Sequence, residues 1–99
     1  MTRALGTVGD HVRTWRKLNH LTIDQVAARA NVSPDTVARL EAGRGASLEK
    51  TLTILRVLGI LDQVVTAVDP MSTDVGRLRA DQQLPQRVRN KQATRVPTP

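Results

Sequence analysis

Residues 21–43, LTIDQVAARANVSPDTVARLEAG, constrain the fold of this 99-residue chain more than any other stretch. They predict two short helices joined by a tight turn. Thr22 is a suitable N-cap for the first of these helices, whose apolar positions end near Ala30. Asn31 follows where the chain must turn sharply, and asparagine adopts the left-handed conformation more readily than any residue except glycine.

The second short helix has start and stop signals of its own. Ser33 can cap it, and Pro34 fits its first position, where a missing N–H costs nothing. Val37 and Leu40 are its inward residues, and Gly43 is expected to end it. Each helix is therefore bounded by residues whose local chemistry favours that boundary.

A further helix is expected on the N-terminal side, over residues 8–19. Thr7 and Asp10 resemble a capping box, and the spacing of Val8, Val12 and Trp15 predicts an inward stripe.

Two more helices are expected on the C-terminal side. One begins after Ser47, and the other covers residues 61–68 and stops at Asp69-Pro70. The inward residues of the first of them are Leu48, Leu52 and Leu55. No alternating strand pattern persists, so the sequence predicts an all-α fold.

The composition excludes several classes of function. The net charge of +6 favours an anionic partner such as nucleic acid. The chain contains no cysteine, and Trp15 is its one aromatic residue, so thiol chemistry and base stacking on aromatic platforms are not expected. No stretch resembles a signal peptide or a membrane span. His11 and His20 have no acidic partners at helical spacing, so neither a metal nor a cofactor is expected.

The domain organisation follows from a change in composition near Pro70. Residues 1–69 form one expected domain, and residues 70–99 form a basic tail that is poorly structured in isolation. The tail has two candidate uses, which are to follow DNA phosphates or to fold on a protein partner. Its basic residues are Arg77, Arg79, Arg87, Arg89, Lys91 and Arg95.

Two short helices joined in this way suit the reading of DNA. The second helix can lie in the major groove while the first braces it across the backbone. Ala27 and Ala30 supply small residues where the helices touch, and Val32 is an apolar residue at the corner. The outward residues of the second helix are Pro34, Asp35, Thr36 and Arg39.

The chain resembles the lambda Cro and repressor family of helix-turn-helix domains, also called the XRE family. The matching pieces are VGDHVRTWRKLNHLT and DQVAARANVSPDTVARLEAGRGASLEKTLTILRVLGI. Within them, Leu-Glu-Ala-Gly-Arg at 40–44 followed by Ser47-Leu48 is the most specific part. The resemblance implies a compact five-helix bundle that is commonly dimeric on a palindromic operator.

The resemblance also implies roles for individual residues. Thr36 and Arg39 would be the main base-reading residues, with Pro34 and Asp35 at the other reading positions. Arg39 suits guanine, Asp35 could accept from a cytosine amino group, and Pro34 offers only apolar contact. Ile23 departs from the pattern, because the family often has glutamine there.

Phosphate contacts and a structural pair follow from the same positions. Arg44 and Thr22 would contact phosphate, Thr22 together with the N-terminus of its helix. Arg16 and Glu41 would form a partly buried structural pair. The outer side of the first helix is either a solvated face or a backbone contact, and the tail could add contacts of its own. These further candidates are Arg13, Lys17, Arg87 and Arg89.

The last part of the domain has more apolar residues than one small core requires. We expect a two-fold dimer to cover them and to set two reading helices about 34 Å apart, unless the fifth helix folds back and buries them all. The candidate interface residues are Ile54, Val57, Ile60, Leu61, Val64, Val65 and Val68.

These observations predict a sequence-specific double-stranded DNA-binding regulator, most simply a dimeric repressor on a palindromic operator. The expected location is the cytoplasm of a prokaryote or a phage-infected cell, and no enzymatic activity is expected. The alternative is an antitoxin that binds a protein toxin and represses its own operon. Its basis is that residues 48–91 loosely resemble the ends of antitoxins paired with HipA-type kinase toxins.

Overall fold

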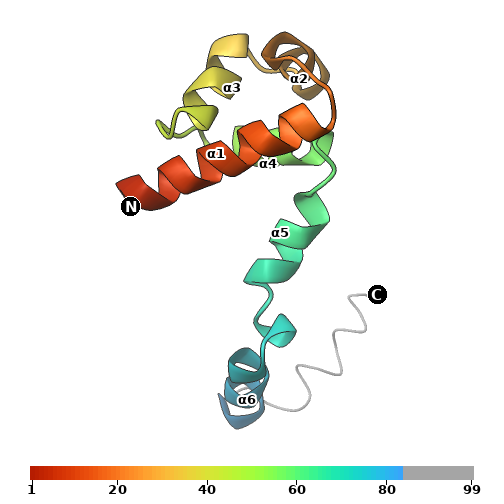
Figure 1. Cartoon of the computed structure of the whole chain (residues 1–99). Helices are drawn as coiled ribbons and strands as arrows, with labels where there is room; N and C mark the ends of the chain where they lie inside the picture. Colours follow the sequence, from red (N-terminus) through yellow and green to blue (C-terminus); the bar gives the residue numbers. More distant parts are fainter. Residues whose placement is uncertain (84–99) are drawn as a thin grey trace. The chain divides into compact units, whose positions relative to one another are not determined.

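The computed structural model describes residues 1–83, which contain helices and no strand (Figure 1). The all-α prediction is therefore confirmed. The helices are α1 (Thr2–Leu18), α2 (Ile23–Ala30), α3 (Pro34–Glu41), α4 (Leu48–Val57), α5 (Leu61–Val68), the 3-10 helix η1 (Pro70–Ser72) and α6 (Asp74–Gln83). The chain divides into two compact units, Met1–Gln63 and Val64–Pro99.

The boundaries of α2 and α3 arise from the local signals in the sequence. The Thr22 side chain accepts a hydrogen bond from the Gln25 N–H, and the Gln25 side chain accepts one from the Thr22 N–H, which makes a full capping box. Asn31 ends α2 in the left-handed conformation at φ 56°. Ser33 then caps α3 by accepting from the Thr36 N–H at 3.1 Å, with Pro34 at the first helical position.

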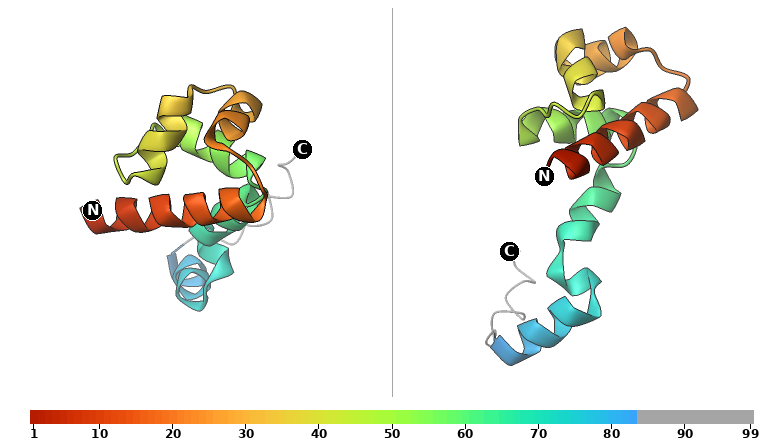
Figure 2. Two further views of the ribbon diagram at one scale, coloured as in Figure 1. Left: turned by 45° about the horizontal axis from the view of Figure 1, so that its top comes forward. Right: turned by 60° about the vertical axis from the view of Figure 1, so that its left-hand side comes forward.

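The core of the first unit confirms the scaffold expected from the sequence. Helix α3 packs on both α1 and α2, and α4 packs on α2 (Figure 2). Ile54 is fully buried in this core, so its assignment to a dimer interface is wrong because it has no surface to offer. The buried apolar residues of the unit are Val12, Val26, Ala27, Ala30, Val37, Leu40, Ile54, Leu55 and Leu58.

Helix α1 begins six residues earlier than expected, at Thr2, and the capping box at Thr7 does not exist. Two close approaches at glycines accompany this longer helix. In its added first turns, Gly6 lies against the loop after α3, because a Cβ at Gly43 would come within 2.9 Å of the Gly6 Cα. A Cβ at Gly9 would lie 2.5 Å from the Leu40 carbonyl oxygen, so the α1 backbone is pressed against the end of α3. Packing of this kind extends α1 through its glycines, which intrinsic propensity alone disfavours.

Two expectations about inward residues are also wrong. Val8 is 43 % exposed and Trp15 39 % exposed, because α1 presents the face of Gly9 and Val12 to the core instead. Leu48 is 72 % exposed, since it is the first residue of α4.

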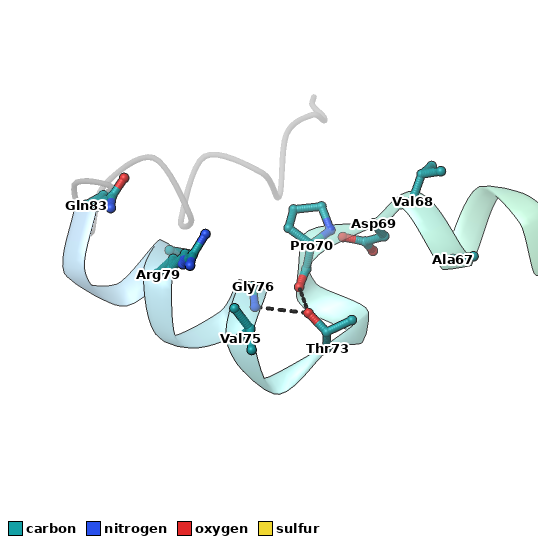
Figure 3. Close-up of a pocket in the computed structure, with 10 residues that line it drawn as sticks. Ala67, Val68, Asp69, Pro70, Thr73, Val75, Gly76, Arg79 and Gln83 are labelled. Atoms are coloured by element: carbon teal, nitrogen blue, oxygen red, sulfur yellow. Dashed lines mark hydrogen bonds between the residues drawn. The ribbon is translucent and has the colours of Figure 1, made fainter. Parts of the chain in front are cut away.

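The segment expected to be a basic tail is helical as far as Gln83. Thr73 begins α6 by accepting from the Gly76 N–H at 2.9 Å, and a Cβ at Gly76 would collide with the Pro70 carbonyl oxygen. A hollow of about 510 Å³ lies between the end of α5, η1 and α6 (Figure 3). Ala80 is the one buried apolar side chain between residues 64 and 83. Residues 84–99, with Arg87 and Arg89, lie outside the described residues.

Candidate nucleic-acid interface

Helix α3 turns one face to the core and the opposite face to solvent. Val37 and Leu40 are buried, whereas Pro34, Asp35 and Arg39 are exposed. Three of the four residues expected to read bases therefore lie open on one short helix. The fourth, Thr36, is half-buried, and its hydroxyl lies 2.9 Å from Ser33 Oγ, which occupies one of its hydrogen-bonding positions.

An ion pair beneath this face fixes α3 to α1. Arg16 donates from Nε to Glu41 Oε2 at 2.7 Å and from Nη2 to Glu41 Oε1 at 3.0 Å. Its Nη1 donates to the Leu21 carbonyl at 3.0 Å, which ties in the turn that precedes α2. The pair expected between Arg16 and Glu41 is thus present, in the two-pronged geometry that favours arginine over lysine.

Burial makes this pair structurally important. The side chain of Arg16 is 12 % exposed and that of Glu41 is 3 % exposed. The hydrogen bonds from Arg16 to Glu41, with the attraction between their charges, raise the pKa of Arg16 although burial lowers it. Arg16 therefore stays charged at any physiological pH and cannot act as a proton donor or acceptor.

Arg13 also faces Glu41, with its Nε 3.6 Å from Glu41 Oε1. Its side chain is 57 % exposed, so this second ion pair is weak. The expected contact of Arg13 with phosphate stays a prediction, since more than half of this side chain is open to solvent. Lys17, one turn further along α1, is exposed.

A basic hollow of about 540 Å³ adjoins α3, and no carboxylate lines it. Arg39 reaches it from α3, Arg44 from the loop after α3, and Lys50 from the first turn of α4. The Arg44 N–H donates to the Arg39 carbonyl at 2.9 Å, which fixes the loop to the helix end. Residues that line the hollow are Leu5, Thr36, Arg39, Arg44, Gly45, Ala46, Ser47 and Lys50.

Lys50 is a candidate that the sequence did not reveal. It lies three residues after the cap Ser47, and its N–H donates to Ser47 Oγ at 3.1 Å. A lysine in a first helical turn usually has no special meaning. Only the packing of the first unit brings this one to the same hollow as Arg39 and Arg44.

The N-terminus of α2 is a separate candidate site. The capping box occupies Thr22 Oγ1 as an acceptor and the Thr22 N–H as a donor. The hydroxyl proton of Thr22 remains available to donate, because an oxygen that accepts one bond can still donate another. Gln25, the other member of the box, therefore positions Thr22.

Within residues 1–83, no group of three or more His, Cys, Asp or Glu side chains is arranged to hold a metal ion. His11 and His20 are both exposed, and His20 adopts a left-handed conformation at φ 57° after α1. No described helix is long and apolar enough to cross a membrane.

Comparison with known proteins places the chain in a family. Searches of characterised proteins and of solved structures find no match. A family model described as a helix-turn-helix domain, HTH_31, matches residues 7–68, which is more than half of the chain. This match covers α2 and α3 with the helices that support them, and the chain belongs to this helix-turn-helix domain family.

Proposed function

We propose that the protein is a sequence-specific double-stranded DNA-binding regulator, and most simply a repressor that occupies a palindromic operator as a homodimer. The observation that carries this proposal is the exposed Arg39 of α3 beside a hollow that three basic side chains and no acidic ones line. A helix that enters the major groove needs readers on its outer face and cations at its edge, where the phosphates pass.

The exposed face of α3 supplies the base contacts in this proposal. Arg39 donates two N–H groups to O6 and N7 of a guanine, which is the commonest specific contact to a base. Asp35 accepts from a cytosine amino group, and Pro34 contacts a thymine methyl group. Thr36 contributes the hydrogen-bonding capacity that Ser33 leaves free.

Phosphate contacts position α3 in the groove. Arg44 and Lys50 bind one stretch of backbone from the basic hollow. Thr22 and the N-terminus of α2 bind another, since the first N–H groups of a helix favour an anion. Neither contact carries sequence information, but both fix the register in which Arg39 meets a base.

A dimer is part of the proposal because one reading face this small provides little specificity. Apolar residues that continue from the end of α4 along α5 are half-buried or exposed, so they can meet a second copy. They are Val57, Ile60, Leu61, Val64, Val65 and Val68. Two copies of α3 about 34 Å apart would then meet two half-sites one DNA turn apart.

The experiment that tests this function is selection of binding sites from a randomised DNA duplex pool with the full-length protein. The expected result is one enriched sequence with two inverted half-sites. Enrichment without any shared sequence would contradict specific reading, and a single half-site would contradict the dimer.

A protein partner is the second candidate function, and the second unit favours it. Met71, Val75 and Leu78 are exposed there, and Ala80 is the one buried apolar side chain of residues 64–83. Surface of this kind fits an antitoxin that binds its toxin through this unit. Deletion of residues from Ser72 onward should then leave DNA affinity and its salt dependence unchanged. A weaker affinity with a lower salt slope would instead assign this segment to DNA.

A further inference from the structure

Helix α1 carries a largely apolar stripe that the first unit covers only in part. The α1 stripe consists of Ala4, Val8, His11, Trp15 and Leu18, and all five side chains are exposed. They alternate at spacings of four and three residues, which places them along one line of a helix. Val8, Trp15 and Leu18 are 43 %, 39 % and 64 % exposed.

The core contact of α1 uses a different line. Leu5, Gly9, Val12 and Arg16 repeat at the same spacings, and all four are buried or half-buried. A surface helix needs one apolar face, about 100° wide, to pack on its own core. Helix α1 has that face and the α1 stripe next to it, and the stripe keeps an open apolar surface at Val8, Trp15 and Leu18.

The size of an interface also requires more surface than α5 supplies. A stable protein–protein interface takes about 20–30 residues from each partner. Helix α5 has eight residues, and at 1.5 Å per residue it is about 12 Å long. The apolar residues between Val57 and Val68 therefore supply only part of a typical interface, and a neighbouring surface has to complete it.

The α1 stripe is placed to be that neighbour. Its end at Leu18 is next to Asn19, whose side chain donates to the Leu58 carbonyl at 3.3 Å. Leu58 closes α4, and α5 begins at Leu61. The first unit thus fixes one end of the α1 stripe beside the point where α5 starts.

The charge of the stripe decides which partner fits. Copies of a chain with net charge +6 repel one another, so a face without lysine or arginine meets less repulsion when two copies associate. The α1 stripe contains none, and it contains no carboxylate. An acidic protein partner would find no cation on the α1 stripe and would bind more favourably to the basic surfaces of the chain.

We propose that a second copy of the chain covers the α1 stripe, so that Val8, Trp15 and Leu18 of both copies belong to one two-fold interface. This inference rests on the proposed dimer and adds α1 to it. In a two-fold interface, both copies contribute the same surface, so each residue appears once from each copy. Trp15 would be its central aromatic residue, the type most enriched at the energetic centre of interfaces.

The test compares two matched variants of the full chain, Leu18→Glu and Leu78→Glu. The two leucines are 64 % and 58 % exposed, so both variants place a new charge on a helix surface. Sedimentation velocity over a dilution series gives the dimer dissociation constant, and circular dichroism confirms the fold. Leu18→Glu should weaken the dimer at least about tenfold, whereas Leu78→Glu should leave it unchanged.

The emission of the single tryptophan gives a second measurement on the unmodified chain. Trp15 is the one fluorophore of its class, with no tyrosine or phenylalanine present. Its emission maximum should shift to shorter wavelength as the dimer forms, because the ring leaves water.

Several results would overturn the proposal. One such result is a dimer whose formation leaves the Trp15 emission maximum unchanged, with equal dissociation constants for Leu18→Glu and Leu78→Glu. It would exclude α1 from the interface but leave the proposed DNA-binding dimer in place. Equal weakening by both variants would show that the effect of Leu18→Glu is not local. A chain that binds its selected duplex but never dimerises would overturn both interfaces and leave the DNA-binding function intact.

Discussion

Removal of one partner of the Arg16–Glu41 pair should strongly destabilise the protein. In Glu41→Leu, the guanidinium of Arg16 would lose both bonds to Glu41, at 2.7 Å and 3.0 Å, at a site where its side chain is 12 % exposed. A charge left uncompensated in such a site costs about 3–5 kcal/mol. Small domains are stable by only about 5–15 kcal/mol, so urea denaturation followed by circular dichroism should show a large shift of the midpoint.

The double variant Arg16→Met/Glu41→Leu separates the ion pair from simple loss of packing. It should recover most of the stability, because apolar residues of similar size often replace a buried pair at little cost. Arg13→Ala is the control, since its 3.6 Å contact is exposed and should be worth at most about 1 kcal/mol. If Glu41→Leu cost no more than Arg13→Ala, or if the double variant were as unstable as Glu41→Leu, the pair would not be what holds α3 to α1.

Three further predictions concern single positions. Gly9→Ala should lower the free energy of unfolding by about 1–3 kcal/mol, because the added Cβ would lie 2.5 Å from the Leu40 carbonyl oxygen. Urea titration measures this loss, and unchanged stability would contradict the contact. Ser33→Ala should lower it by about 1 kcal/mol through loss of the α3 cap, and Ser33→Gly by less. Lys50→Ala should weaken binding to all duplexes alike and reduce the slope of log affinity against log salt by about one, and a slope equal to that of the unmodified protein would exclude Lys50 from phosphate contact.

Local chemistry explains which parts of the fold were predictable. The approximate bounds predicted for α2 and α5 agree with the structure, and the cap and first residue of α3 were correct as well. Cap side chains such as Thr22 and Ser33 bond within three residues of themselves. These bonds form within one turn of helix, so the caps can be recognised in the sequence without knowing the tertiary structure.

Tertiary contacts account for the errors. The early first turns of α1 contact the distant Gly43 through Gly6, which no local pattern shows. The same limitation hid the position of Lys50 beside Arg39 and the contact of Arg13 with Glu41. The sequence shows that a residue is apolar but not what packs against it, so the burial of Ile54 in α4 and the exposure of Val65 in α5 could not be told apart in advance.

Helix α6 was missed for a different reason. Its sequence, DVGRLRADQQ, has almost no apolar face, and Ala80 is its one buried residue. An amphipathic pattern is the main signal for a helix in a sequence, and α6 lacks it. Its cap, Thr73 bonded to the Gly76 N–H, was the signal that could have located it.

In the proposed function, Arg39 reads a base from the exposed face of α3. The most direct test measures Arg39→Ala by fluorescence anisotropy on the selected duplex and on duplexes with each base pair substituted in turn. We expect a loss of about 1–3 kcal/mol on the preferred site, together with loss of preference at one base pair per half-site. An equal loss on every duplex, with all preferences kept, would make Arg39 a phosphate contact and contradict the proposed reading of DNA.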